Sequence, residues 1–295
     1  MAVVLGRLSR QRVGAIGAAR LSSEYNSSRS FATDGKDDSN KEESSKGEIK
    51  EREGWISKFL VRRIEPTGKP HSKMLSDKKS IYALYTHNIK PDSVDKYLEN
   101  YEKVVNVINE KKSSVNCELI GSWTVEAGDL DQAIHLWEYP DGFKNVDRTQ
   151  LELSKDESYQ KLIKESAKCL RSRQLQYLFQ FSYWPTPKMR TGSNKYEFRS
   201  YRLAAGTMIE WGNNWAKGIN YRRKNDEAFG GYFSQVGPLY HVYHFWCYED
   251  LEARREIRDR SWKRPEWDAC VAYTVPLIQE SCSRILSPTT FSPTQ

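Results

Sequence analysis

Two stretches of 23 residues decide the fold: Leu119–Asp141, LIGSWTVEAGDLDQAIHLWEYPD, and Ala228–Asp250, AFGGYFSQVGPLYHVYHFWCYED. Aligned without gaps at an offset of 109, they share seven identical residues, whereas ordinary composition predicts about one or two. Each stretch has an apolar run, a turn with glycine and a second apolar run, which is the pattern of a β-hairpin. The chain therefore contains an internal duplication with a hairpin at the centre of each copy.

The segments before the two hairpins follow one plan. Residues 81–89 alternate as a strand does, and residues 94–108 carry apolar side chains at helical spacing. In the second copy, residues 196–203 predict the matching strand, and Gly206-Thr207 opens the matching helix. Aligning these strands places Tyr97 on Trp211 and Tyr101 on Trp215, so the inward positions of the two helices coincide.

The segments after the hairpins complete each unit. In the first half a helix over 155–173 and a strand over 174–184 are predicted. In the second half we expect a helix over 251–260 that continues through 265–286, kinked at Pro276. Only a weak final strand is then expected after Ser287. Each half reads β-α-β-β-α-β, the ferredoxin-like plan.

The strand pattern predicts how the two halves pack. His135, Trp137 and Tyr139 share one face of their strand, and the matching strand of the second copy is apolar or aromatic on both faces. Strands buried on both sides need a second layer. The predicted fold class is therefore α+β, with two ferredoxin-like sheets packed face to face as a pseudo-dimeric α/β barrel. The candidate barrel-interior pocket consists of His135, Trp137, Tyr139, His244, Trp246 and Tyr248.

The predicted organisation along the chain has five parts. The two repeats are expected over 79–190 and 191–295, preceded by a segment over 55–78 that docks on them. Residues 32–54 hold a single branched apolar residue, Ile49, and predict a disordered linker. A further homo-oligomer of whole chains is compatible with this plan.

The first 31 residues have the composition of a mitochondrial transit peptide. They contain five arginines and one acidic residue, Glu24, and lack the continuous apolar stretch of a secretory signal. Arg29, Phe31 and Ala32 form a candidate processing site, and Arg20-Leu21-Ser22 is a weaker alternative. The other interpretation of this segment is a disordered tail that carries no address.

Composition excludes several classes of protein. The 36 aromatic residues require a core, and no run approaches the roughly 18 apolar residues of a membrane span. The net charge of +7 is concentrated in the first 31 residues, so nucleic-acid binding is not expected. Five scattered cysteines without a Cys-x-x-Cys pair predict reduced core thiols and neither disulfides nor a zinc site.

Several blocks of the sequence resemble the NipSnap family. The resemblance runs from about residue 55 to the C-terminus and rests on Lys90-Pro91, Trp123, Gln132–Tyr139, Tyr196–Tyr201, Gly206–Asn213, Gly230–Gly237 and Tyr273–Glu280. It implies a mitochondrial matrix protein of the dimeric α/β-barrel type. It further implies that import falters in depolarised mitochondria, that the protein then collects on their outer surface, and that autophagy receptors and ubiquitin-like autophagy modifiers bind it there. The import machinery is the other implied partner, and an adaptor role in vesicular trafficking is an alternative.

Docking of an autophagy modifier would use an aromatic residue, two spacers and an aliphatic residue, added as a strand to a sheet edge. Tyr248 and Leu251, with acidic spacers between them, are the candidate pair. Phe143-Val146 and Tyr159-Leu162 have the same spacing. All three lie in or beside predicted folded elements, so a structural role is the competing interpretation.

The sequence also bears on enzyme function. Barrels of this class include cofactor-free monooxygenases, and His135 and His244 would be the candidate catalytic groups. A structural role, with one hydrogen-bonded imidazole in each sheet, explains the recurrence equally well. No metal-ligand spacing, phosphate loop or nucleophile elbow is present. We therefore expect no catalytic residue, no metal and no cofactor, with a small-molecule-binding or oxygenase-like enzyme as the alternative.

Overall fold

The first half of the body has the predicted ferredoxin-like plan. The computed structural model describes residue 68 and residues 70–222 and 226–295. The elements of the first half are β1 (Ile81–Ile89), α3 (Val94–Glu110), β2 (Glu118–Ala127), β3 (Gln132–Tyr139), α4 (Phe143–Ser154), α5 (Glu157–Lys168) and β4 (Leu170–Gln180). Their strands lie in the order β4-β1-β3-β2, so the first strand is central and the hairpin strand β2 is at one end.

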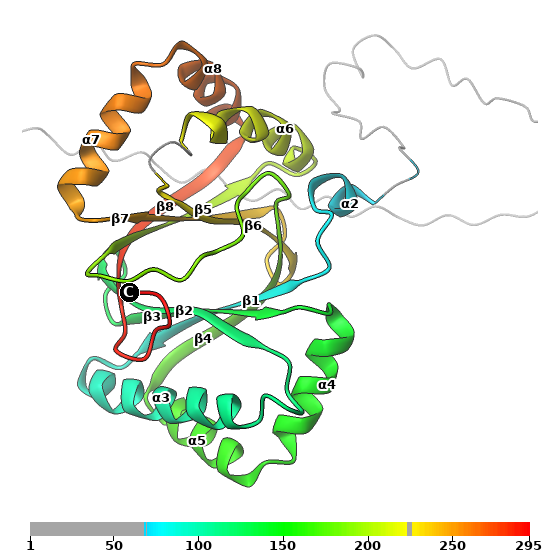
Figure 1. Cartoon of the computed structure of the whole chain (residues 1–295), viewed down its shortest axis with the longest axis vertical. Helices are drawn as coiled ribbons and strands as arrows, with labels where there is room; N and C mark the ends of the chain where they lie inside the picture. The colour runs from blue at the N-terminus through cyan, green and yellow to red at the C-terminus, as the bar shows by residue number, and fades with distance from the viewer. Residues whose placement is uncertain (1–67, 69, 223–225) are drawn as a thin grey trace, which may run out of the picture. The chain divides into compact units, whose positions relative to one another are not determined.

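The second half repeats this order. Its elements are β5 (Lys195–Leu203), α6 (Met208–Gly218), β6 (Ala228–Val236), β7 (His241–Tyr248), α7 (Leu251–Trp262), α8 (Pro265–Thr274) and β8 (Ile278–Pro288). Antiparallel pairing of β2 with β8 and of β4 with β6 joins the two sheets. The eight strands thereby form a closed barrel, with the helices of each half on the outer face of its own sheet (Figure 1).

Three apolar clusters correspond to three layers. One cluster fills the barrel with side chains from both halves, including Trp123, Leu136 and Phe245. A second lies between the first sheet and helices α3–α5, and a third between the second sheet and helices α6–α8. The face-to-face packing predicted from the doubly apolar strands is therefore confirmed.

Glycine explains the shared hairpin geometry. In both hairpins the strand register shifts at the equivalent glycine, Gly121 or Gly230. A Cβ atom at Gly121 would lie 2.2 Å from the ring of Trp123, and one at Gly230 would lie 2.5 Å from the hydroxyl of Tyr232. The aromatic residue two positions along folds back over the glycine, so any side chain there would collide with it.

The C-terminal elements differ from the prediction. The helix expected to run to residue 286 ends at Thr274, a single 3-10 turn covers Val275–Leu277, and β8 is a full strand of 11 residues. Pro276 lacks a backbone N–H and stops the helix rather than kinking it. Strand β8 is largely polar and exposed, so it carries no hydrophobic pattern, and its backbone pairing on both sides holds it in place.

The first half holds smaller differences. Helix α4 was not predicted, α5 ends at Lys168, and β4 begins at Leu170, four residues before the predicted start. The short helix α2 (His71–Leu75) belongs to the predicted docking segment, and Leu75 packs in the core of the second half. The rest of that segment, the linker and the transit peptide with its processing site lie outside the described residues.

Within the described ranges, none of the helices is both long enough and apolar enough to span a membrane. The five cysteines are free, as expected. Four of them are buried, whereas Cys282 on β8 is exposed and is not the core thiol that was predicted.

Candidate functional site

The six residues predicted to line a pocket inside the barrel lie on the opposite face of the sheets. Trp137 and Tyr139 belong to the core under the first-half helices, and Trp246 and Tyr248 to the core under the second-half helices. Strand alternation separates the two faces correctly, but it does not say which face the helices cover. The aromatic residues on α3 and α6 attract these side chains outward, whereas their aliphatic and aromatic neighbours fill the barrel.

Each half has a cavity between its sheet and its helices. The first-half cavity has a volume of about 370 Å³ and is lined by Trp137 and Tyr139 together with other phenol and aliphatic side chains. Its polar groups are phenols, the imidazole of His87, Gln174 and Arg173. The second-half cavity, of about 430 Å³, is lined by Trp246 and by four further tryptophans. Three of the six predicted residues therefore line a cavity, although not the predicted one.

A hydrogen-bond network supports the first-half cavity. The Tyr97 hydroxyl lies 2.8 Å from Nε2 of His135 and 2.5 Å from Nδ1 of His87. Nδ1 of His135 lies 2.9 Å from the Ser122 hydroxyl. Burial, with the charge of Arg173 adding to it, lowers the pKa of His87 to about 4. Burial also lowers the pKa of His135 far below its ordinary range, so both imidazoles are neutral at pH 7.

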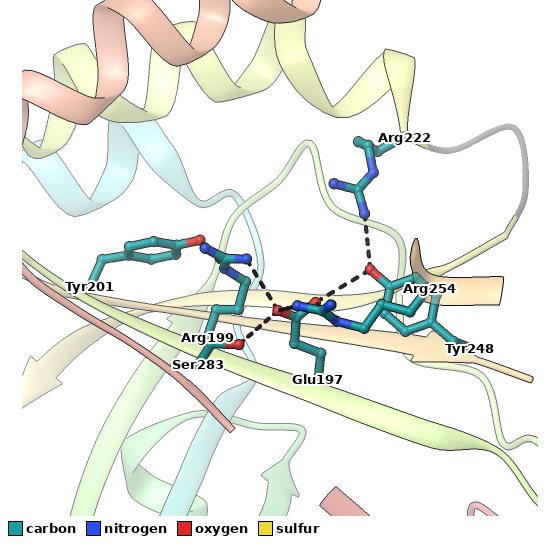
Figure 2. Close-up of polar contacts among 7 residues, drawn as sticks. All are labelled: Glu197, Arg199, Tyr201, Arg222, Tyr248, Arg254 and Ser283. Carbon is teal, nitrogen blue, oxygen red and sulfur yellow. Dashed lines mark hydrogen bonds and ion pairs between the residues drawn. The ribbon is translucent and has the colours of Figure 1, made fainter. Parts of the chain in front are cut away.

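A buried carboxylate organises the second half. Glu197, on β5, receives hydrogen bonds from Nε of Arg254 at 3.0 Å, from Nη2 of Arg254 at 2.7 Å and from the Ser283 hydroxyl at 2.7 Å. Arg199, on the same strand, donates to it at 3.1 Å (Figure 2). Burial alone would raise the pKa of Glu197, but Arg254 and Arg199 outweigh it and bring that pKa to about 2.

Arg222 forms a second buried charge pair. Its Nε donates to Glu227 at 3.0 Å, and its Nη2 donates to the Tyr248 hydroxyl at 3.0 Å (Figure 2). The guanidinium carbon lies 4.3 Å from the centre of the Trp246 ring, a cation–π contact. Buried guanidinium groups thus form part of the floor of the second-half cavity.

His244 does not repeat the role of His135. Neither of its ring nitrogens has a hydrogen-bond partner among the described residues. Its neighbours are aromatic, with ring centres 4.6 Å away for Trp215 and 4.7 Å for Trp184. The expectation of one hydrogen-bonded imidazole in each sheet therefore holds for His135 and is wrong for His244. Burial, with Arg199 and Arg222 nearby, keeps the pKa of His244 well below its ordinary value.

The predicted docking pairs are not available in the folded body. Tyr248 is only 3% exposed and is held by Arg222, although Leu251 is 49% exposed. In the pair Phe143 and Val146 the aliphatic anchor is buried, and Tyr159 and Leu162 pack against the first-half core. An anchor residue must leave its own core to enter a partner, so Tyr248 and Leu251 cannot serve as a docking motif while this half is folded.

The charged residues of the second half were not identified from the sequence. The missed residues are Glu197, Arg199, Arg222, Arg254 and Arg258. A signal was present, because Glu197 and Arg199 share the strand face of Tyr201 and alternate with apolar residues. Charges on a face that packs under helices must be paired or must bind something. Among the described residues there is no group of three or more His, Cys, Asp or Glu placed to hold a metal ion.

The comparisons with known proteins agree with this architecture. The NIPSNAP family model matches residues 82–185 and 196–293, one match in each half. The chain is a member of the NipSnap family. It is 59% identical over 243 residues to Protein NipSnap of Drosophila melanogaster, covering 82% of this chain and 89% of the fly protein. It is 42% identical to Protein NipSnap homolog 1 of Danio rerio, covering 83% and 88%.

Solved structures extend the likeness of this NipSnap chain at the level of the fold. A putative monooxygenase from Fusobacterium nucleatum superposes with a TM-score of 0.56 at 10% identity, covering 72% of this chain and 94% of that one. At such low identity the likeness shows the fold alone, a dimeric α/β barrel.

Proposed function

We propose that this NipSnap protein is a non-enzymatic mitochondrial protein that marks damaged mitochondria. In this proposal it is imported into the matrix of healthy organelles. When import fails it accumulates on the outer surface and recruits autophagy receptors and ubiquitin-like autophagy modifiers. The observation that carries the proposal is the family match across both halves, with relatives 41–59% identical over 82–83% of the chain.

The leader gives this fate a physical cause. Residues 1–31 carry five arginines and one glutamate. Moving one positive charge inward across the membrane potential is worth about 2.3 kcal/mol per 100 mV. Loss of the potential therefore removes a large part of the driving force for import, and the leader senses damage without a ligand.

The positions of the two recurring histidines favour a non-enzymatic role. His135 and His244 are fully buried, and among the described residues that line the two cavities neither is present. An imidazole that transfers protons must come within hydrogen-bond distance of a substrate atom. His135 is engaged with Tyr97 and Ser122, and His244 is enclosed by aromatic rings.

The leader can be tested with a fusion of residues 1–54 to a reporter. We expect import into polarised mitochondria and outer-surface accumulation after depolarisation. A matched fusion with Arg7, Arg10, Arg12, Arg20 and Arg29 changed to Gln should not be imported at either potential. Equal import of the native fusion with and without a potential would contradict the sensing role.

The recruitment step needs the full chain. In cells that lack the protein, depolarised mitochondria should collect fewer autophagy receptors, and re-expression should restore the signal. Unchanged recruitment would overturn the proposal and favour a trafficking adaptor. Loss of a small-molecule turnover in folded His135→Gln or His244→Gln variants would favour an enzyme instead.

A further inference from the structure

The second-half cavity has more positive than negative charge around it. Four guanidinium groups lie in and under its floor, but the buried carboxylates beside them are only two, Glu197 and Glu227. The remaining carboxylate of the lining, Glu280, is exposed at the rim and pairs with Arg202. The region therefore has an excess of positive charge that its own side chains do not neutralise.

Arg258 is the guanidinium without a partner. Arg199 and Arg254 share Glu197, and Arg222 pairs with Glu227. Arg258, on α7, lines the cavity, is partly buried, and makes no hydrogen bond or ion pair with any of the described residues. Burial and the repulsion from Arg199 lower its pKa, which means that the site strains to hold this charge. A partly desolvated charge without a counter-ion is unfavourable unless a ligand supplies one.

The walls offer unused donors and aromatic surface. The indole N–H groups of Trp211 and Trp215 are buried, and neither has an acceptor within the part of the chain that the structure describes. Both residues line the cavity, as do Trp246 and Trp267. At its mouth Trp262 is 54% exposed, an unusual position for so large an apolar side chain. Buried donors without acceptors are costly, which is a second and independent sign of an absent ligand.

We propose that the second-half cavity binds an organic acid, with its carboxylate on Arg258 and its apolar body between the tryptophans. One free guanidinium presents a planar fork that matches one carboxylate. The indole N–H groups can donate to the same oxygens or to another acceptor on the ligand. The volume of about 430 Å³ is within the range of about 300–1,000 Å³ for small-molecule pockets. This inference does not depend on the proposed role in autophagy.

The first-half cavity is a built-in comparison. It lies at the equivalent place in the fold, yet its one cation, Arg173, is exposed at the mouth. Its tryptophan N–H is satisfied, because Trp137 donates to the Tyr101 hydroxyl at 3.1 Å. The same ligand should therefore bind one cavity per chain.

Calorimetric titration of the full chain tests the proposal. The probes are naphthalene-2-carboxylate, decanoate, the uncharged naphthalene-2-methanol, and inorganic phosphate. We expect one carboxylate bound per chain, with the better of the two carboxylates identifying an aromatic or an aliphatic body. The alcohol and phosphate should bind at least about tenfold more weakly, because the first lacks the charge and the second lacks the apolar body.

Two arginines of α7 supply the matched variants. Arg258→Gln should weaken carboxylate binding by at least about tenfold, whereas Arg255→Gln should leave it unchanged, since Arg255 is exposed and pairs with Glu252 and Asp259. Without ligand, Arg258→Gln should unfold at the same or a higher temperature than the native chain. A residue with a merely structural role would lower that temperature.

Four results would overturn the proposal. They are the absence of carboxylate binding up to millimolar concentration, equal binding of the alcohol, equal or tighter binding of phosphate, and equal affinities in the Arg258→Gln and native chains. None of them bears on receptor recruitment, so this proposal and the proposed autophagy role can fail separately.

Discussion

The two halves place the same His-x-Trp-x-Tyr strand in different chemical surroundings. In the first half the helix carries Tyr97 and Tyr101, whose hydroxyls bond to His135 and Trp137. In the second half tryptophans occupy both aligned helix positions, and the polar atoms of His244 and of these indoles have no partners within the described residues. Duplication has kept the backbone plan, whereas the chemistry beneath the helices has diverged.

The neighbouring strand diverges in the same way. Ala83 and Tyr85 of β1 align with Glu197 and Arg199 of β5, and each pair faces the helices of its own half. The first half thus encloses a neutral network of hydrogen bonds, and the second half encloses a charged cluster. A shared fold is therefore no reason to expect a shared ligand.

The largest expected effect comes from giving the second half the residue of the first. Glu197→Ala removes the carboxylate that holds Arg199 and Arg254. We expect a loss of about 3–5 kcal/mol in the free energy of unfolding, because buried guanidinium groups are left unpaired. Urea unfolding measures it. Glu126→Gln, at an exposed pair with Lys195, is the control and should cost about 1 kcal/mol or less. A small loss for both variants would mean that the cluster contributes nothing to folding.

Exchanging one hairpin residue between the halves is the next test. Ser122 aligns with Gly231, where a Cβ atom would lie 2.3 Å from the Trp184 ring. Gly231→Ser should therefore destabilise the protein by up to about 3 kcal/mol through overpacking, and it should not restore a partner to His244. The reverse change, Ser122→Gly, should cost about 1–2 kcal/mol through lost hydrogen bonds. A neutral Gly231→Ser would show that Trp184 can move away.

Acid should distinguish the halves through His87, which aligns with Tyr201. Its folded pKa of about 4 is below the value of about 6.5 for an unfolded chain. The unfolded state therefore gains the proton first, and the stability that neutral His87 contributes is lost as the pH falls from about 6.5 to 4. We expect about 2 kcal/mol of this loss between pH 7 and pH 5. In His87→Gln the slope of stability against pH should flatten, and an unchanged slope would contradict the shift.

The smallest effect isolates single hydroxyl groups. Tyr97→Phe removes the hydroxyl that joins His87 and His135 and should cost about 1–2 kcal/mol. Tyr183→Phe is its match near the second half, because the Tyr183 hydroxyl is buried without a partner among the described residues. That change should be neutral or stabilising. Thermal unfolding of both variants measures the difference, and equal losses would mean that the network of the first half has no special value.

The fold could be predicted further than the site. Strand alternation and the repeated hairpin contain the duplication, the two ferredoxin-like units and their face-to-face packing. Strand β8 was missed because its side chains are mostly solvent-exposed, so the information that makes it a strand is in the edges of β2 and β5. Helix α4 was likewise left unassigned before the structure was known.

The site failed at a different step. Alternation places His135 and Trp137 on one face, but the choice between barrel and helices depends on three-dimensional packing, and it was made the wrong way. The guanidinium cluster draws on β5, α7 and the segment after α6, which are brought together only by the fold (Figure 2). No local spacing marks such a group, although charges between aromatic residues on an inward strand face are a usable signal.

The seam between β2 and β8 has a consequence for the order of events during synthesis. Ser287 pairs with Thr124, more than half the chain away, so the ring of strands cannot close until the last segment has left the ribosome. Until then the free edge of β2 has its backbone N–H and C=O groups open to any other strand. A growing chain must keep this edge from sticking to its neighbours, and a chaperone that shields extended segments would act best before residue 278 emerges.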